Sequence, residues 1–294
     1  MIVFSIPQHR GLLPAEPREQ PQLTLGRCRF GSFPDGELWV EVEDRVEGGE
    51  CAVLGSLAPP HEQALSVLLL AHTLKRAGAR RVLALLPYLG YGRQDAAGPS
   101  QSLGAAWAGA MLQAAGVDEL VTIDLHSDAA ATCLPLPVAS LSPASLFATE
   151  LRRGSARGLC VVAPDEGAID RCQAVADAAG IEAPIAHLRK RRGAGGVVQS
   201  ALIGEVGERA VLVDDIIDTG GTLLSACAEL RRAGVGEISI MATHGTFSGD
   251  RWRKLPAAGA QRIVVTDSVP DVRDRAGAGV EVLSITPLLP AALA

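Results

Sequence analysis

The sequence is poor in aromatic residues and has no excess of basic ones. Aromatics make up 3% of its 294 residues, so a core must come from the aliphatic side chains within the 48% that is hydrophobic. The chain carries 27 basic and 33 acidic residues, a net charge of −6. Because proteins that bind nucleic acid usually have a basic face, this balance argues against nucleic acid and against an anionic membrane surface. Small anionic substrates are compatible with it, since local basic clusters can hold them.

The sequence also lacks cysteine pairs and long apolar runs. Its six cysteines are scattered, with no C-x-x-C pair and no zinc-ligand spacing, which favours buried reduced thiols over disulfides or zinc. The first residues, M-I-V-F-S-I-P-Q-H-R, lack the regions of a signal peptide and are typical of a first strand. No segment approaches the length of a membrane span. We therefore expect a cytoplasmic protein.

One pattern recurs along the chain: the end of an amphipathic helix, then a glycine, then an aliphatic strand. The clearest copies occupy residues 73–88, 111–126 and 229–244. Glycine suits the left-handed conformation just past a helix, and the glycines at this position are Gly78, Gly116, Gly180, Gly234 and Gly259. Repeated units of this kind predict βαβ crossovers and mainly parallel sheets.

The spacing of these units is too irregular for a solenoid and favours two doubly wound α/β domains. Prolines interrupt the pattern at 134–144, and a predicted strand at 158–165 opens a second series. We expect one domain over residues 1–141 and another over 142–294, each a mainly parallel sheet flanked by helices. Because such sheets bind ligands at the carboxyl ends of their strands, the functional motifs should lie there.

The stretch V-L-V-D-D-I-I-D-T-G-G-T-L-L, residues 211–224, combines three acids with a Thr-Gly-Gly-Thr turn. A glycine-rich turn leading into a helix near Leu223 offers backbone N–H groups and hydroxyls to a phosphate. Asp214 and Asp215 need another partner, and sugar hydroxyls or a magnesium ion are suitable. Ribose 5-phosphate carries both a phosphate and vicinal hydroxyls. A capped turn with solvated acids would explain Thr219 but not three acids around a double glycine.

Other polar motifs follow predicted strands. L-P-Y-L-G-Y-G-R-Q-D, residues 86–95, ends in Arg93 and Gln94, which are suitable donors to a phosphate or a purine. His126 and Asp165 each lie just past a strand end, where they could share one magnesium ion. The basic run L-R-K-R-R-G-A-G-G, residues 188–196, fits a mobile cationic loop for phosphoryl transfer. Taken alone, each has a plain alternative: an exposed loop, a structural histidine or a solvated basic run.

Together with F-P-D-G-E-L-W-V (33–40), which alone predicts a hairpin, and A-T-H-G-T-F-S-G (242–249), these motifs resemble those of ribose-phosphate diphosphokinases (PRPP synthetases) in order and approximate spacing. Residues 211–224 alone also resemble the PRPP-binding signature of type I phosphoribosyltransferases, which lack the first half of the series. The resemblance implies two phosphoribosyltransferase type I-like domains. It also implies transfer of diphosphate from Mg-ATP to the anomeric hydroxyl of ribose 5-phosphate, giving PRPP and AMP. The chain has no G-x-x-x-x-G-K-[ST] motif, so its ATP site is not a P-loop.

The resemblance also implies site residues, a Mg²⁺ cofactor and a homo-oligomer, either a dimer or a hexamer. ATP would contact Phe33, Asp35, Glu37, Arg93, Gln94 and Asp95, the first three at a subunit interface. Magnesium would be held by His126 and Asp165. Ribose hydroxyls would bind Asp214 and Asp215, and the 5-phosphate would bind Asp218, Thr219, Gly220, Gly221 and Thr222. Charge on the transferring phosphates would be stabilised by Lys190 and Arg192.

The sequence departs from this family pattern after R-Q-D. Many members carry a basic loop there, whereas this chain reads A-A-G-P-S-Q-S-L-G-A-A-W. The missing cations motivate one alternative, a non-catalytic regulatory subunit that assembles with an active synthetase. A second alternative is a phosphoribosyltransferase that consumes PRPP, and the motifs at 33–37 and 93–95 count against it.

Overall fold

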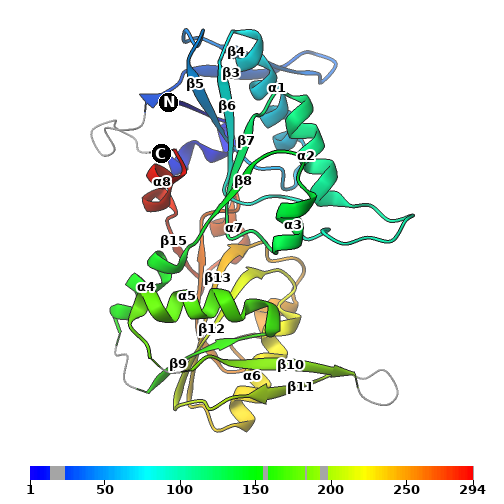
Figure 1. Cartoon of the computed structure of the whole chain (residues 1–294). Helices are drawn as coiled ribbons and strands as arrows, with labels where there is room; N and C mark the ends of the chain where they lie inside the picture. Colours follow the sequence, from blue (N-terminus) through cyan, green and yellow to red (C-terminus); the bar gives the residue numbers. More distant parts are fainter. Residues whose placement is uncertain (14–23, 155–157, 183, 193–197, 294) are drawn as a thin grey trace. The chain divides into compact units, whose positions relative to one another are not determined.

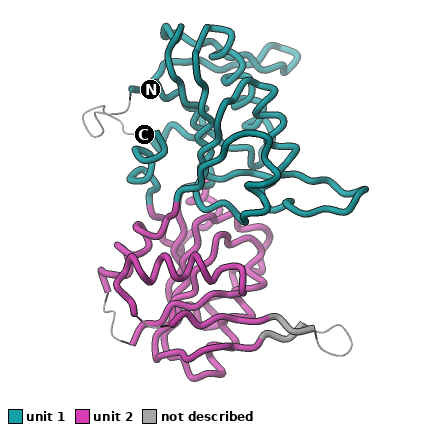
Figure 2. The backbone as a smooth tube through the Cα atoms, in the orientation of Figure 1, with its two compact units in different colours: residues 1–141, 268–270, 284–294 teal, residues 142–267, 271–283 magenta. Residues whose placement is uncertain are grey.

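The computed structural model describes residues 1–13, 24–154, 158–182, 184–192 and 198–293, without the side chains of residues 190–200 (Figure 1). The chain divides into two compact units (Figure 2). The first contains Met1–Leu141, Ser268–Pro270 and Ser284–Ala294, and the second contains Ser142–Asp267 and Asp271–Leu283. The last residues therefore group with the first unit, whereas the sequence pattern places all of 142–294 in one domain.

The first unit is built on a sheet whose neighbouring strands are all parallel, in the order β2-β1-β5-β6-β7-β8. Its strands are β1 (Ile2–Ser5), β2 (Thr24–Leu25), β5 (Glu50–Leu54), β6 (Arg81–Leu86), β7 (Glu119–Ile123) and β8 (Val138–Leu141). A separate antiparallel hairpin is formed by β3 (Cys28–Ser32) and β4 (Leu38–Val42). The helical segments are η1 (Pro7–Leu12), α1 (Glu62–Arg76), α2 (Gly104–Ala114), α3 (Asp128–Cys133), η5 (Thr286–Leu288) and α8 (Leu289–Ala292).

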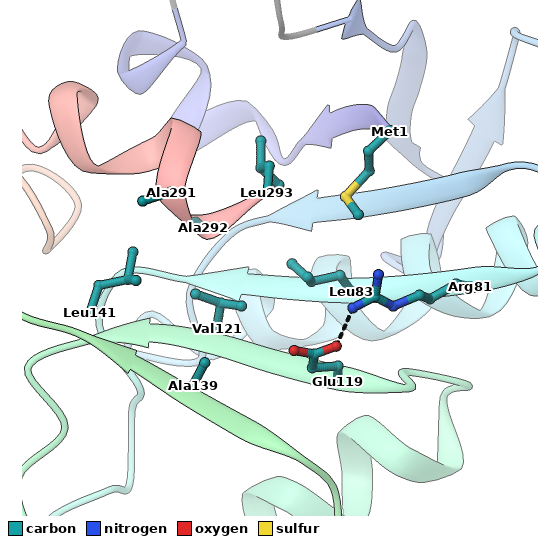
Figure 3. A pocket seen from close by; sticks show the side chains of 10 residues that line it. All are labelled: Met1, Arg81, Leu83, Glu119, Val121, Ala139, Leu141, Ala291, Ala292 and Leu293. Carbon is teal, nitrogen blue, oxygen red and sulfur yellow. Dashed lines mark hydrogen bonds and ion pairs between the residues drawn. The ribbon is translucent and has the colours of Figure 1, made fainter.

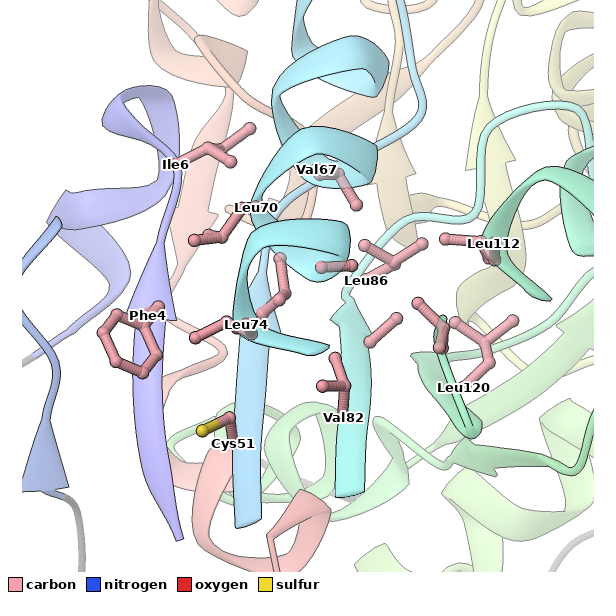
Figure 4. Close-up of a cluster of buried hydrophobic side chains, with 14 of the residues drawn as sticks. Phe4, Ile6, Cys51, Val67, Leu70, Leu74, Val82, Leu86, Leu112 and Leu120 are labelled. Atoms are coloured by element: carbon pink, nitrogen blue, oxygen red, sulfur yellow. The ribbon is translucent and has the colours of Figure 1, made fainter. Parts of the chain in front are cut away.

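Aliphatic side chains join one face of this sheet to its helices (Figure 4). Leu70 and Leu74 of α1 and Leu112 of α2 are fully buried in one cluster with Val82 of β6 and Leu120 of β7. Burying each such side chain stabilises the fold by about 1.5–3 kcal/mol. The low aromatic content thus leaves the core to leucine and valine, as the composition predicts.

The second unit has a seven-stranded sheet in the order β11-β10-β9-β12-β13-β14-β15, parallel except for the antiparallel β10–β11 pair. Its strands are β9 (Leu159–Ala163), β10 (Ala186–Arg192), β11 (Val198–Ile203), β12 (Arg209–Ile217), β13 (Glu237–Gly245), β14 (Ala260–Thr266) and β15 (Glu281–Leu283). The helical segments are α4 (Ala144–Arg152), η3 (Glu166–Ala168), α5 (Ile169–Ala179), α6 (Gly221–Arg232), η4 (Arg251–Lys254) and α7 (Val272–Ala276).

Helices cover both faces of the second sheet, as a doubly wound fold requires. Leu212 of β12 belongs to the same core cluster as Leu223 of α6. Its neighbours Val211 and Val213 belong to another cluster, which contains Phe147 of α4. Because successive side chains of a strand point to opposite faces, the aliphatic run at the start of β12 fills both cores. The predicted fold class, mainly parallel α/β sheets flanked by helices, is confirmed.

All five glycines of the recurring pattern have positive φ, between +73° and +108°. The last one, Gly259, follows the short 3₁₀ segment η4 and turns rather than the predicted helix end. Pro256 explains the difference, because proline lacks the N–H that an α-helix needs at this point. The six cysteines are free, and Cys133 is the least buried of them. Within the described residues, no helix is long and apolar enough to cross a membrane.

Candidate active site

The carboxyl end of β12 and the start of α6 carry the densest group of predicted site residues (Figure 1). Asp214 and Asp215 are still part of the strand, and Asp218 and Thr219 form the turn that follows it. The N–H of Leu224 donates to the carbonyl of Gly220 at 2.9 Å, which closes the first turn of α6. The N–H groups before Leu224 therefore precede the intrahelical hydrogen bonds and are available to a ligand at a positive helix end.

The two adjacent acids of β12 are in direct contact. The N–H of Asp215 donates to Oδ1 of Asp214 at 3.0 Å, and the Asp215 side chain is only 6% exposed. Burial, and next the charge of Asp215, raise the pKa of Asp214 well above the usual carboxyl value. The charge of Asp165 adds to this pKa shift, and the guanidinium of Arg171 opposes it. Hydroxyl groups that donate hydrogen bonds to Asp214 and Asp215, or a cation beside them, would reduce the repulsion between the two carboxylates.

The turn after β12 is fixed by the chain that leaves β13. The hydroxyl of Thr246 donates to Oδ1 of Asp218 at 3.2 Å and to the carbonyl of Ile217 at 3.3 Å. Backbone N–H groups of Thr246 and Phe247 also donate to that carbonyl, each at 3.0 Å. The turn is therefore anchored to the segment that follows β13.

The two glycines of the turn have different structural roles. Gly220 has φ +77°, and a Cβ there would lie 2.8 Å from Cα of Trp252. Gly221 has no such constraint, since the heavy atom nearest to an added Cβ would be Nη1 of Arg251 at 3.5 Å. The α6 N-terminus has no side-chain cap, because Gly220 occupies the N-cap position. The fold thus requires Gly220, whereas Gly221 leaves space beside the open helix end.

The basic run predicted as a loop is instead part of a strand. Lys190 and Arg192 belong to β10 and pair in antiparallel register with Ser200 and Val198 of β11. The prediction of a loop at these two positions is wrong, because the run pairs with a second strand. Their side chains lie outside the described residues, so their predicted catalytic role stays a prediction.

Arg93, Gln94 and Asp95 follow β6 in the first unit, as predicted. Arg93 and Gln94 are exposed, and Oε1 of Gln94 accepts a hydrogen bond from the hydroxyl of Ser102 at 3.0 Å. The carboxylate of Asp95 accepts one from the hydroxyl of Ser127. This last contact joins the loop after β6 to the loop after β7.

Phe33, Asp35 and Glu37 form the exposed turn of the β3–β4 hairpin. The N–H of Glu37 donates to Oδ1 of Asp35 at 3.1 Å, and Phe33 is 53% exposed. The predicted hairpin is confirmed. The expectation that every motif lies at the carboxyl end of a parallel strand is wrong here, because this hairpin is antiparallel and separate from both large sheets.

The two predicted magnesium ligands belong to different units. His126 is exposed after β7 in the first unit, and Asp165 is half-buried after β9 in the second. Within the described part of either unit, no group of three or more His, Cys, Asp or Glu side chains could hold a metal ion. The magnesium site therefore stays a prediction.

A cavity of about 130 Å³ lies elsewhere in the first unit (Figure 3). It is lined by Met1, Arg81, Leu83, Glu119, Val121, Ala139, Leu141, Ala291, Ala292 and Leu293. Arg81 and Glu119 form an ion pair, and the remaining lining is apolar. None of the predicted site residues borders this cavity, so it carries no part of the predicted chemistry.

Comparison with known proteins supports the family resemblance in both units. A model of the N-terminal domain of ribose phosphate pyrophosphokinase matches residues 1–116, and a model of the phosphoribosyl synthetase-associated domain matches residues 197–293. The ribose-phosphate pyrophosphokinase of Ralstonia nicotianae is 35% identical over 273 residues, covering 91% of this chain and 86% of that protein. The chain belongs to the ribose-phosphate pyrophosphokinase family.

A solved structure of a family member extends the likeness to the fold. The crystal structure of phosphoribosylpyrophosphate synthetase from Mycobacterium smegmatis matches with a TM-score of 0.86 at 31% identity, covering 99% of this chain and 97% of that one. The Bacillus caldolyticus ribose-phosphate pyrophosphokinase is 31% identical over 92% of this chain and 87% of its own length. The predicted phosphoribosyltransferase type I-like fold and the assignment to this class of enzyme are confirmed.

The structure of this ribose-phosphate pyrophosphokinase family member also places, near the candidate site, residues that the sequence motifs did not predict there. Arg171 of α5, six residues after Asp165, interacts electrostatically with Asp214, and the sequence motifs assign it no role at the site. Thr246 and Arg251 both follow β13, whose carboxyl end lies next to that of β12. The predicted parallel sheet could have indicated these two residues, because neighbouring parallel strands bring the loops that follow them together.

Proposed function

We propose that the protein makes PRPP by transferring diphosphate from ATP to ribose 5-phosphate with Mg²⁺. The anomeric hydroxyl oxygen of the sugar attacks the β-phosphorus of ATP and loses its proton. The bond between the β-phosphorus and the oxygen that bridges it to the α-phosphate breaks, and AMP leaves with that oxygen. Family membership supports the class of reaction, and the nucleotide, metal and product are part of the proposal.

The observation that carries the proposal is the geometry at β12 and α6. An uncapped helix end follows a turn held by Thr246, and two adjacent acids, Asp214 and Asp215, lie two residues before that turn. In the proposed complex the 5-phosphate binds the N–H groups and hydroxyls of 218–222, where a helix N-terminus favours an anion. The ribose hydroxyls bind Asp214 and Asp215.

One observation supports the proposal of magnesium. Asp165 provides a carboxylate near Asp214, as its effect on the pKa of that residue requires. Mg²⁺ typically binds one or two carboxylates together with substrate phosphates and water, so few protein ligands are needed. We propose that Asp165 and His126 hold it, where it would polarise the phosphoryl oxygens of ATP. Lys190 and Arg192 would stabilise the charge that develops on the transferred group.

The first unit would bind the nucleotide through Arg93, Gln94 and Asp95. We further propose that the exposed Phe33, with Asp35 and Glu37, forms the adenine site of a homo-oligomer, a dimer or a hexamer, and that the protein acts in the cytoplasm, where its free cysteines stay reduced. Light scattering of the purified chain gives the oligomeric state, and a monomer in the presence of ATP would contradict this part of the proposal.

The decisive experiment is a product assay. Purified protein is incubated with ATP, Mg²⁺ and ribose 5-phosphate, and nucleotides and PRPP are resolved by anion-exchange chromatography. We expect AMP and PRPP in equal amounts. ADP as the nucleotide product would refute diphosphoryl transfer, and an inactive chain that gains activity only with a second synthetase would support the regulatory alternative.

A further inference from the structure

We propose that Arg251 binds the 5-phosphate of the sugar substrate beside the open N-terminus of α6. The proposal rests on the proposed function, because it assigns one more residue to the same ribose 5-phosphate site. Arg251 belongs to η4, which lies outside the sequence motifs used to predict that site. Three observations place and characterise its guanidinium.

The first observation is its position beside the open end of α6. Nη1 and Cζ of Arg251 lie 3.5 and 3.6 Å from the point where a Cβ on Gly221 would be. The hydroxyl oxygen of Thr219 lies 3.8 Å from the same point. Two groups that can donate hydrogen bonds therefore converge on one side of Gly221, next to the first N–H groups of the helix.

The second observation is that this guanidinium has no anionic partner in the described part of the chain. Arg251 forms no ion pair or hydrogen bond with any residue that the structure describes, whereas Arg253, two residues on, pairs with Oδ1 of Asp250 at 3.3 Å. A cation at a helix N-terminus is unfavourable, because that end of the helix already carries a partial positive charge. Arg251 is exposed, so water reduces this cost, and an anion bound beside it would offset the remainder.

The third observation is that η4 is fixed against the turn. Trp252 is 4% exposed and packs on Phe247 with ring centroids 4.5 Å apart. Its Cα would lie within 2.8 Å of a Cβ on Gly220, so the backbones of η4 and the turn are in close contact. The guanidinium of Arg253 covers the ring of Trp252, with Cζ 4.6 Å from its centroid. The anchored Trp252 thus keeps its neighbour Arg251 beside the turn.

An anion with several acceptor oxygens resolves the unfavourable placement. A phosphate at the helix end would accept from the N–H groups of α6 and from the planar fork of Arg251 simultaneously, and arginine suits such bidentate contacts. The same cation would offset the acids that crowd the sugar side of the site. Arg251 is therefore a substrate-binding residue selective for the phosphorylated sugar.

The test compares Arg251→Gln with Lys254→Gln, which removes the same charge from another exposed position of η4. Calorimetric titration with ribose 5-phosphate should show a Kd about tenfold or more higher for Arg251→Gln, as expected for a lost charge-assisted hydrogen bond. Arg251→Lys should restore part of the affinity, and the Kd of Lys254→Gln should stay within about twofold of the wild type. Without ligand, the melting temperature of Arg251→Gln should equal or exceed that of the wild type, because an unfavourable charge is removed.

Each other outcome contradicts the proposal in a distinct way. Unchanged affinity in Arg251→Gln overturns it, and so does an equal loss in both glutamine variants, which would indicate a general charge effect. A lower melting temperature together with weaker binding would indicate a structural role only. If the wild type binds ribose 5-phosphate but forms no AMP, the proposed reaction is refuted. The comparison of binding affinities still decides the role of Arg251. If the wild type does not bind ribose 5-phosphate, the proposed function and this inference both fall.

Discussion

Replacing each glycine of the β12–α6 turn by alanine should separate the requirements of the fold from those of the ligand. In Gly220→Ala the new Cβ would be 2.8 Å from Cα of Trp252, and the residue would keep φ near +77°. A left-handed conformation costs a residue other than glycine about 1–2 kcal/mol. Forcing an extra carbon into a filled space costs about 1–3 kcal/mol. The free energy of unfolding should therefore fall by about 2–5 kcal/mol.

Gly221→Ala is the matched control for stability. Its φ lies outside the left-handed region, and the heavy atom nearest to the new Cβ is the end of a flexible arginine side chain at 3.5 Å. Alanine reduces the freedom of the unfolded chain, which stabilises a compatible site by about 0.4–1 kcal/mol. The same Cβ would crowd the phosphate, so the Kd of ribose 5-phosphate should rise by about tenfold or more.

The measurement is urea unfolding followed by tryptophan fluorescence. Of the three tryptophans in the sequence, only Trp252 belongs to the second unit. In a background that carries Trp39→Phe and Trp107→Phe, the fluorescence signal is therefore specific to that unit. Calorimetry with ribose 5-phosphate gives the affinity. If Gly220→Ala were as stable as the wild type, the close contact with η4 would not require glycine at this position. Wild-type affinity in Gly221→Ala would refute the phosphate turn.

Three further predictions concern charged residues of the site. Asp214→Asn should raise the melting temperature at pH 7.5 by about 2 °C or more. The reason is that the pKa of Asp214 is raised in the folded state, so ionisation of this carboxyl destabilises the fold as pH rises through that pKa. The higher melting temperature of Asp214→Asn should therefore disappear below pH 4. A difference from the wild type that stays constant in thermal scans across this range would contradict the raised pKa. Lys190→Ala should lower kcat by about 10³-fold with little change in KM, and steady-state kinetics showing a change in KM alone would argue against a role in the transition state. Asp218→Ala should weaken ribose 5-phosphate binding by about tenfold and leave ATP binding intact; equal loss of both in calorimetric titrations would indicate that the site has simply unfolded.

Local sequence patterns predicted the structure correctly where the conformation depends on a residue's own backbone preference. The five glycines of the recurring unit adopt positive φ because only glycine does so without steric cost, and that preference is visible in the sequence. The run at 211–224 likewise forms a strand, a turn and a helix, because consecutive aliphatics and a double glycine leave few other conformations. The same local reading was wrong at Lys190 and Arg192, where pairing with β11 makes a strand of a polar run.

The sequence by itself determined the parallel α/β class and the strand, turn and helix at 211–224 with its acids, because each depends on periodicity or on neighbours along the chain. Tertiary structure alone decided which distant side chains join that turn. The hydroxyl of Thr246 reaches Asp218, and the guanidinium of Arg251 lies beside Gly221, because β13 pairs with β12 and delivers its following loop to the same end of the sheet. Such contacts depend on strand order and packing, which no single stretch of sequence encodes.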